Sequence, residues 1–185
     1  MKDNELAAVA REEFERVEGP YGGNAYRCGA VLSDGTHLPC VLLASLESVV
    51  SLAVRRFEES RNDDLLPEDQ RRFGAGFQYA DIVRVFVSSG NRLSGHDIAR
   101  LEQSPYALPL ARLREVRGET RMGWTEFAGV MRDGNEFGFG TAYSMDFFHM
   151  PEGYRGEDVV EIISHKRVDP LYRERPFFTC WVEGL

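Results

Sequence analysis

The chain has 185 residues, a formal net charge of -8 and 43% hydrophobic residues, which is the composition of an ordinary folded domain. These values exclude a disordered chain, a collagen-like chain and a short scaffold held by disulfides. An acidic surface repels phosphate backbones, so we expect no nucleic-acid partner. The sequence contains no run of 18 apolar residues and no apolar leader core at its start, so we expect a cytoplasmic protein that does not enter a membrane.

The basic residues are almost all arginines. Of the 22 Lys and Arg residues, only Lys2 and Lys166 are lysines. We interpret this bias as the codon usage of a GC-rich bacterial genome, not as a functional signal.

The first half of the chain predicts a helix, a hairpin and a second helix. Apolar residues at spacings of three and four predict a helix over 4–18, which Gly19-Pro20 ends. Residues 25–44 have the pattern of a β-hairpin around Ser33-Asp34-Gly35. The clearest helical periodicity covers 46–60.

Two turns are compatible with the hairpin of residues 25–44. A two-residue turn would mix polar and apolar side chains on each face. A three-residue loop with Gly35 in the left-handed conformation pairs Leu32 with Thr36 and Cys28 with Cys40, and it gathers the apolar side chains on one face. We therefore expect the second register, with Cys28 and Cys40 as facing, buried free thiols and not as half of a metal site.

The middle of the chain predicts a strand, a loop and a short helix. Residues 81–88 are rich in β-branched residues and predict a central strand. The polar loop 88–97 follows, and a short helix is expected after Ser94, with Asp97 in an approximate capping box.

The last third, residues 122–185, is β-rich. A second hairpin, over 124–132 and 135–148, turns at Arg132-Asp133-Gly134, and the same loop type pairs Phe127 with Phe139 and Gly129 with Phe137. Two further strands are expected over 157–164 and 177–183. This order predicts a single α+β domain over 1–185, with a largely antiparallel sheet or half-closed barrel of about six to seven strands and packed helices.

One strand of the second hairpin has a face of small residues. Gly138, Gly140, Ala142 and Ser144 alternate with bulky side chains. A bare face admits a close neighbour, and we expect the helix over 46–60 to pack there.

Loop 88–97 carries the candidate anion ligands Arg92, Ser94 and His96. Free amides at a helix start attract anions, although Asp97 at the same start disfavours a phosphate. The alternative is a capped helix that follows a glycine-rich turn. The sequence has no complete catalytic constellation, no spacing typical of a metal site and no nucleotide-binding fingerprint, so we expect no metal or cofactor and lean against an enzyme.

Aromatic residues and methionines are dense between residues 143 and 154 and again near the C-terminus. Exposed side chains of this kind favour protein interfaces, and the alternative is a second small core under the loop 149–156. The candidate interface residues are Tyr143, Phe147, Phe148, His149, Met150, Tyr154 and Trp181.

Three functions are compatible with these patterns. The leading hypothesis is a non-enzymatic bacterial cytoplasmic protein that binds another protein, as an adaptor, an antagonist or a self-associating subunit. The alternative is a small-molecule anion-binding protein or enzyme with a pocket between the small-residue strand and the loop 88–97, where Asp97 or Asp146 would act as the base. The third is a structural subunit of a phage or secretion assembly.

Overall fold

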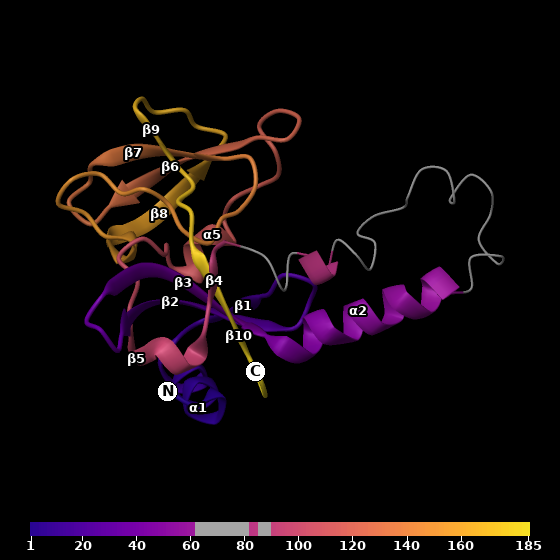
Figure 1. Ribbon diagram of the computed structural model, residues 1–185. Coiled ribbons are helices and arrows are strands. Elements are labelled where there is room, and N and C mark those ends of the chain that lie inside the picture. Colours follow the sequence, from indigo (N-terminus) through magenta and orange to yellow (C-terminus); the bar gives the residue numbers. More distant parts are fainter. Residues whose placement is uncertain (62–81, 85–89) are drawn as a thin grey trace.

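The computed structural model describes residues 1–61, 82–84 and 90–185, and these form an α+β fold with two β-sheets (Figure 1). The helices are α1 (Asp3–Glu13), α2 (Leu46–Arg61) and α5 (Leu110–Leu113), with single 3-10 turns at Gly95–Asp97 and Gly156–Asp158. The strands are β1 (Arg16–Glu18), β2 (Asn24–Leu32), β3 (His37–Ser45), β4 (Arg92–Leu93), β5 (Ile98–Glu102), β6 (Thr125–Met131), β7 (Glu136–Thr141), β8 (Val159–Ser164), β9 (Leu171–Arg173) and β10 (Phe178–Val182).

The larger sheet has six strands, in the order β1-β2-β3-β10-β4, with β5 also paired to β2; the smaller has the order β8-β6-β7-β9. Strand β10 runs parallel to β3 and β4, and β9 runs parallel to β7, so both sheets are mixed. In the described ranges there are thus two open sheets, which corrects the expectation of one largely antiparallel sheet or half-closed barrel. The larger sheet contains parallel pairs because β10 returns to it from the end of the chain, a long-range pairing that no local pattern predicts.

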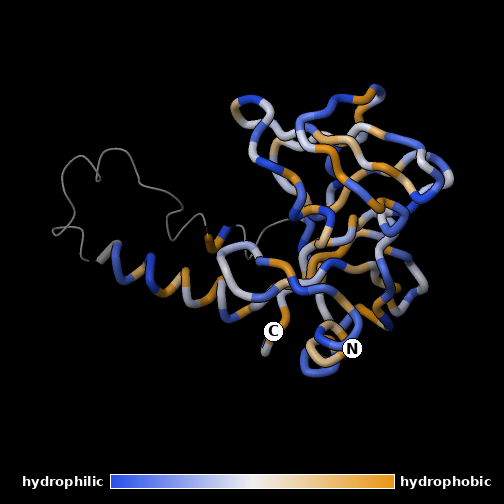
Figure 2. The backbone as a smooth tube through the Cα atoms, turned by 180° about the vertical axis from the view of Figure 1, so that it is seen from behind, coloured by the Kyte–Doolittle hydropathy of each residue, from blue (hydrophilic) through white to orange (hydrophobic). Residues whose placement is uncertain are grey.

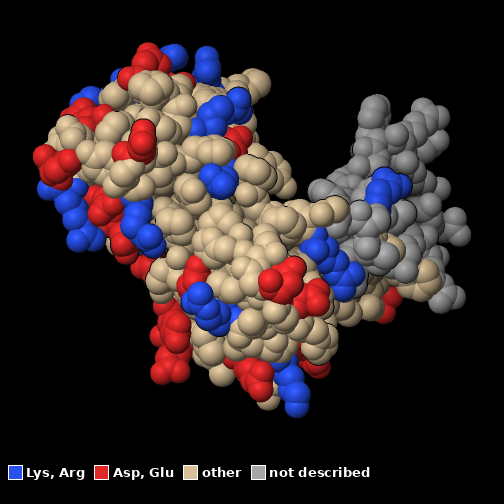
Figure 3. Space-filling view, turned by 60° about the vertical axis from the view of Figure 1, so that its left-hand side comes forward, with Lys and Arg blue, Asp and Glu red and all other residues tan. Residues whose placement is uncertain are grey.

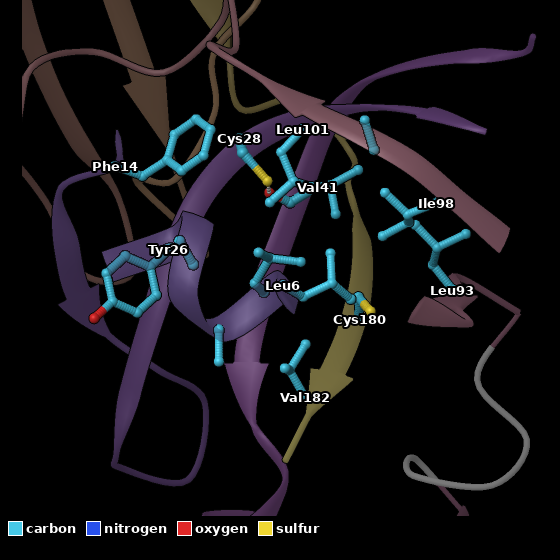
Figure 4. Close-up of a cluster of buried hydrophobic side chains, with 14 residues drawn as sticks. Leu6, Phe14, Tyr26, Cys28, Val41, Leu93, Ile98, Leu101, Cys180 and Val182 are labelled. Carbon is cyan, nitrogen blue, oxygen red and sulfur yellow. Dashed lines mark hydrogen bonds between the residues drawn. The ribbon is translucent and has the colours of Figure 1, made fainter. Parts of the chain in front are cut away.

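A buried cluster lies between α1 and the larger sheet. Its side chains come from α1 and from β2, β3, β4, β5 and β10. Figure 4 shows them converging, with Leu6 of α1 near the centre. Cys28, Val41 and Cys180 are fully buried in this cluster.

Two further clusters bury the neighbouring residues Phe147 and Phe148. Phe148 packs edge-on against Phe127 and Phe139 in the core of the smaller sheet, with ring centroids 5.5 and 5.6 Å apart. Phe147 lies on the other face of the larger sheet, with Cys40, Leu42 and their neighbours. The chain after β7 therefore ties the two sheets together.

Several expected elements differ from the structure. Helix α1 ends at Glu13, and residues 16–18 form β1, which pairs with β2. Residues 82–84 are helical, so the strand expected over 81–88 is wrong there, and its other residues lie outside the described ranges. The turn after Ser94 continues into strand β5, which pairs with β2. Residues 16–18 and 98–102 form strands because each segment pairs with β2, a long-range contact that overrides the local pattern.

The first hairpin has the expected turn and an unexpected bulge. The Leu32 amide donates to the Thr36 carbonyl (2.8 Å), and Gly35 has φ +87°. Beyond Leu38, the residues Pro39 and Cys40 lie opposite one residue of β2, and Cys28 pairs with Val41 instead of Cys40. Cys28 and Cys40 therefore occupy different clusters on opposite faces, which corrects the expected facing pair. Proline cannot donate to a ladder, and bulges are one of the places where strands tolerate it.

The second hairpin has the expected register along its paired residues, but its second strand, expected over 135–148, ends at Thr141. Phe127 pairs with Phe139 and Gly129 with Phe137. The Met131 amide donates to the Asn135 carbonyl at 2.8 Å, and Gly134 has φ +86°. The same three-residue turn therefore opens both hairpins.

The expected packing of α2 on the small-residue strand is wrong. A Cβ atom on Gly138 would lie 1.9 Å from the Val168 carbonyl oxygen, and one on Gly140 would lie 2.6 Å from the Trp124 ring. These two neighbours cover the strand. Helix α2 leads away from both sheets (Figure 1), and hydrophobic and hydrophilic residues alternate along it (Figure 2). Among the described helices, none is long and apolar enough to cross a membrane.

Candidate binding groove

A groove of about 550 Å³ lies where β4 and β10 meet the turn after β1 and the turn after β7. Its apolar wall consists of Pro20, Tyr21, Tyr143, Pro176, Phe177 and Trp181. Its polar lining consists of Asn91, Arg92, Ser144, Glu174, Arg175 and Thr179. The groove thus brings part of the loop 88–97 together with part of the aromatic segment 143–154.

A stacked aromatic pair forms one wall. The rings of Tyr21 and Trp181 are 6.2 Å apart and inclined by 19°. Trp181 belongs to β10, whereas Tyr21 lies in a glycine-rich turn closed by the Gly19 amide, which donates to the Gly23 carbonyl (3.0 Å). Tyr21 has φ +65°, a conformation that costs energy for a residue with a side chain. The turn therefore holds the Tyr21 ring against Trp181 at the expense of backbone strain.

Tyr143 is a highly exposed residue of the groove, with 91% of its surface accessible. It sits in a turn in which the Thr141 hydroxyl oxygen accepts the Tyr143 and Ser144 amides, both at 3.1 Å. Burial raises the pKa of the Tyr21 phenol, and nearby Tyr143 raises it further.

The floor of the groove is held by hydrogen bonds and ring contacts. The Asn91 side-chain amide donates to the Phe177 carbonyl (3.0 Å), and the Asn91 carbonyl accepts from the Thr179 amide (2.9 Å). Phe177 packs on Phe147, with centroids 5.5 Å apart. The Arg175 guanidinium lies 4.0 Å over the Tyr106 ring. Four residues of the lining are therefore held by contacts with one another or with Phe147 and Tyr106, namely Asn91, Arg175, Phe177 and Thr179.

Glu174 supplies an unsatisfied acceptor. Its Oε1 atom is 3.6 Å from an Arg173 nitrogen, but its Oε2 atom is buried and has no hydrogen-bond partner in the part of the chain that the structure describes. The Glu174 side chain is 23% exposed. A buried acceptor without a donor costs about 1–3 kcal/mol.

Of the candidate anion ligands, only Arg92 lines the groove. Ser94 and His96 are exposed on the 3-10 turn that follows β4. That turn is tucked against α1, since a Cβ on Gly95 would approach Leu6 to 2.7 Å. Neither of the expected bases, Asp97 and Asp146, belongs to the lining.

The candidate interface residues divide into four groups. Tyr143 and Trp181 line the groove, and Phe147 and Phe148 are buried between and within the sheets. Met150 and Tyr154 pack against the core of the smaller sheet, and His149 is exposed.

Sequence reasoning missed Tyr21 and Glu174. The Pro20-Tyr21-Gly22-Gly23 turn was a signal for Tyr21, because it places an aromatic residue at an exposed turn. No local signal points to Glu174.

The three cysteines are buried free thiols. Burial raises the pKa of Cys40 to about 11 and that of Cys180 to about 12, and it raises the pKa of Cys28 as well. Thiols of this kind are unreactive at neutral pH. Within the described residues, no group of three or more His, Cys, Asp or Glu side chains has the arrangement of a metal site.

The surface charge is mixed. On the face shown in Figure 3, acidic and basic side chains lie next to one another over both sheets, and uncharged residues occupy much of the area between them. No model of a known protein family, no curated protein sequence and no solved structure matches this chain. Its function must therefore be argued from the groove.

Proposed function

We propose that this chain is a non-enzymatic bacterial protein of the cytoplasm that binds a short extended segment of another protein in the aromatic groove. The observation that carries the proposal is the combination of the stacked Tyr21–Trp181 pair with Tyr143, which is 91% exposed, across one groove of about 550 Å³.

Aromatic walls suit a peptide because each ring buries a large area and loses few rotamers on binding. Tyr and Trp are also the residues most often found at the energetic centres of protein interfaces. An extended segment lies between such rings without needing a deep cavity. The anchored floor supports the same function, because a preformed groove lowers the entropy cost of binding.

An array of unrelated synthetic peptides, with binding confirmed by calorimetry in solution, tests the proposal. We expect a subset of the peptides to bind, and Tyr143→Ala to weaken them by roughly tenfold or more, as for an interface hot spot. Met122→Ala is the matched control, because Met122 is 97% exposed and lies outside the groove lining. An array on which no peptide binds the wild-type chain, or equal losses in the two variants, would refute the proposal.

The second candidate function is binding of a small anionic molecule in the same groove. It is favoured by the presence of Arg92 in the lining and by a volume within the range of small-molecule sites. A metabolite screen by thermal shift separates the two functions, since a ligand that binds only the native state raises Tm. A rise in Tm with anions that is lost in Arg92→Ala, without any peptide binding, would favour this alternative.

A further inference from the structure

This inference rests on the proposed function and concerns the chemistry and the spacing of the partner segment. We infer that the groove takes an extended segment in which an apolar side chain and an acidic side chain stand two residues apart. The apolar side chain lies between the aromatic rings, and the acidic side chain pairs with Arg92.

The spacing follows from the register of β4 and β10. Arg92 of β4 pairs with Thr179 of the parallel strand β10, and Trp181 is two residues further along β10. Side chains alternate along a strand, so Thr179 and Trp181 stand on one face, and Arg92 is their neighbour there on the next strand. All three residues line the groove, which agrees with this register. Diagonal neighbours of this kind are roughly 7–8 Å apart.

An extended segment matches that separation. It rises about 3.3 Å per residue and its side chains alternate between two faces, so side chains two residues apart lie on one face at about 6.6 Å. The apolar side chain fits between the stacked Tyr21–Trp181 pair and Tyr143. The next side chain on the same face then lies beside Arg92, whereas a side chain only one residue away points out of the groove.

The charges of the lining make the second side chain acidic. The lining holds two arginines, Arg92 and Arg175, and one carboxylate, Glu174. Arg173, which lies outside the lining, offsets the charge of Glu174 with a nitrogen 3.6 Å from Oε1, and the other carboxylate oxygen is buried. The groove therefore presents a net positive charge to a ligand, although the chain as a whole carries -8. Arginine binds a carboxylate through charge-assisted hydrogen bonds, which are stronger than neutral ones.

Of the two arginines, Arg92 is the one placed to bind this side chain. The Arg175 guanidinium stacks 4.0 Å over the Tyr106 ring at the floor of the groove. Arg92 is exposed, and β4 is the last strand of the larger sheet in the described residues. A small carboxylate bound by Arg92 without a peptide is the competing chemistry, and the test distinguishes it.

The test uses short synthetic peptides that share one central leucine and otherwise consist of serine and threonine. The first carries glutamate two residues to either side of the leucine, so that either chain direction places one glutamate beside Arg92. The second has glutamine at those positions, and the third has its glutamates directly next to the leucine. In calorimetric titrations with the full chain, we expect the first peptide to bind roughly tenfold tighter than the other two, the gain from one charged hydrogen bond.

Variants of the chain assign this preference to one arginine. Arg92→Gln should abolish the preference for the first peptide, whereas Arg92→Lys, which keeps the positive charge, should retain most of it. Arg100→Gln is the matched control, because Arg100 is an exposed arginine of β5 outside the lining. It should leave the preference unchanged.

The outcomes separate this inference from the function on which it rests. If peptides bind the groove but glutamate makes no difference, or the same difference at both spacings, the inference is overturned and the proposed function stands. The same conclusion follows if Arg92→Gln keeps the preference, or if Arg100→Gln loses it equally. Binding of acetylglutamate amide as tightly as the first peptide overturns the inference in favour of a small anionic ligand. If neither these peptides nor the unrelated array binds the wild-type chain, both proposals are refuted.

Discussion

The two hairpins β2–β3 and β6–β7 begin with the same turn and continue differently. In each, a three-residue loop ends in a glycine with φ near +86° to +87°, and the aspartate before it accepts a backbone amide. The ladder β6–β7 then stays in register to its end, whereas β2–β3 is interrupted by the bulge at Pro39-Cys40.

The difference shows what a turn determines and what it does not. Local turn chemistry sets the pairing next to the loop, as at Leu32 and Thr36. Further along the strands, the expected register depends on one face of the hairpin being exposed to solvent. That assumption fails for β3, because Val41 and Leu43 are buried on one face and Leu42 and Ala44 on the other. A shift by one residue then exposes no apolar side chain, and the bulge is tolerated.

The largest expected effect is a difference in stability between alanine substitutions at the strand glycines of the two hairpins. Gly138→Ala places a Cβ 1.9 Å from a backbone oxygen, so we expect a loss of roughly 3 kcal/mol or more in the free energy of unfolding. Gly29→Ala meets only ordinary contacts of 3.4 Å and should be neutral within about 1 kcal/mol. Urea denaturation measures both.

Gly138→Ala is liable not to fold at all, so Gly140→Ala serves as a second variant. Its Cβ meets the Trp124 side chain at 2.6 Å, and a side chain can move where a backbone cannot. The loss in free energy of unfolding for Gly140→Ala should therefore lie between those for Gly138→Ala and Gly29→Ala. Equal stability of Gly138→Ala and Gly29→Ala would contradict the close approach of residue 168 to β7.

The second prediction concerns the support of the bulge. The Ser104 hydroxyl donates to the Pro39 carbonyl (2.6 Å) and accepts from the Tyr106 amide (3.2 Å). Ser104→Ala leaves both backbone groups without this partner, and we expect a loss of about 2 kcal/mol in the free energy of unfolding.

Ser33→Ala is the matched control, since the Ser33 hydroxyl bonds the Asp97 carbonyl at 3.2 Å in an exposed position. It should change the free energy of unfolding by less than about 0.5 kcal/mol. A stable Ser104→Ala variant would show that the bulge does not depend on this bond.

The parts of the fold that follow from the sequence are the long, patterned ones. Both Asp-Gly turns, the helix that starts at residue 46 and the longer strands have enough residues for their periodicity to be visible. Strands β1, β4 and β9 have only two or three residues, which is too short for any pattern. Their positions depend on pairing with distant strands.

The residues of the groove also differ in whether the local sequence reveals them. Arg92, Tyr143 and Trp181 carry local signals, namely a polar loop and aromatic density. Glu174 joins them only because the chain returns after β9 and places β10 beside β4. A carboxylate on such a returning segment has no neighbour in the sequence that reveals its surroundings.

The third prediction tests whether the two turns are equivalent. Gly35 and Gly134 have nearly the same φ, and no described atom lies within 4 Å of a Cβ built on either. The cost of an alanine is therefore only conformational, and we expect about 1 kcal/mol for Gly35→Ala and the same for Gly134→Ala. Asparagine, which tolerates this conformation, should cost less at both positions. Thermal or urea unfolding that finds very different losses for the two alanine variants would show that the turns are not equivalent.

The smallest expected effect distinguishes the two turn aspartates. Both have a pKa below the ordinary value of 3.8, Asp34 because it accepts the Thr36 amide, and Asp133 chiefly because it accepts the Tyr154 phenol at 2.6 Å. Tyr154→Phe should raise the pKa of Asp133 toward the ordinary value and leave the pKa of Asp34 unchanged, as carboxyl carbon NMR can measure.

A depressed pKa in the folded state stabilises the fold above the unfolded-state pKa, and this contribution is lost as the pH falls through the folded-state pKa. The stability difference between wild type and Tyr154→Phe should therefore be fully present at neutral pH and shrink below about pH 4, where the carboxylate becomes protonated. A difference that stays constant from neutral to acidic pH would mean that the phenol acts through the hydrogen bond that it accepts from the Asn135 side chain and not through Asp133.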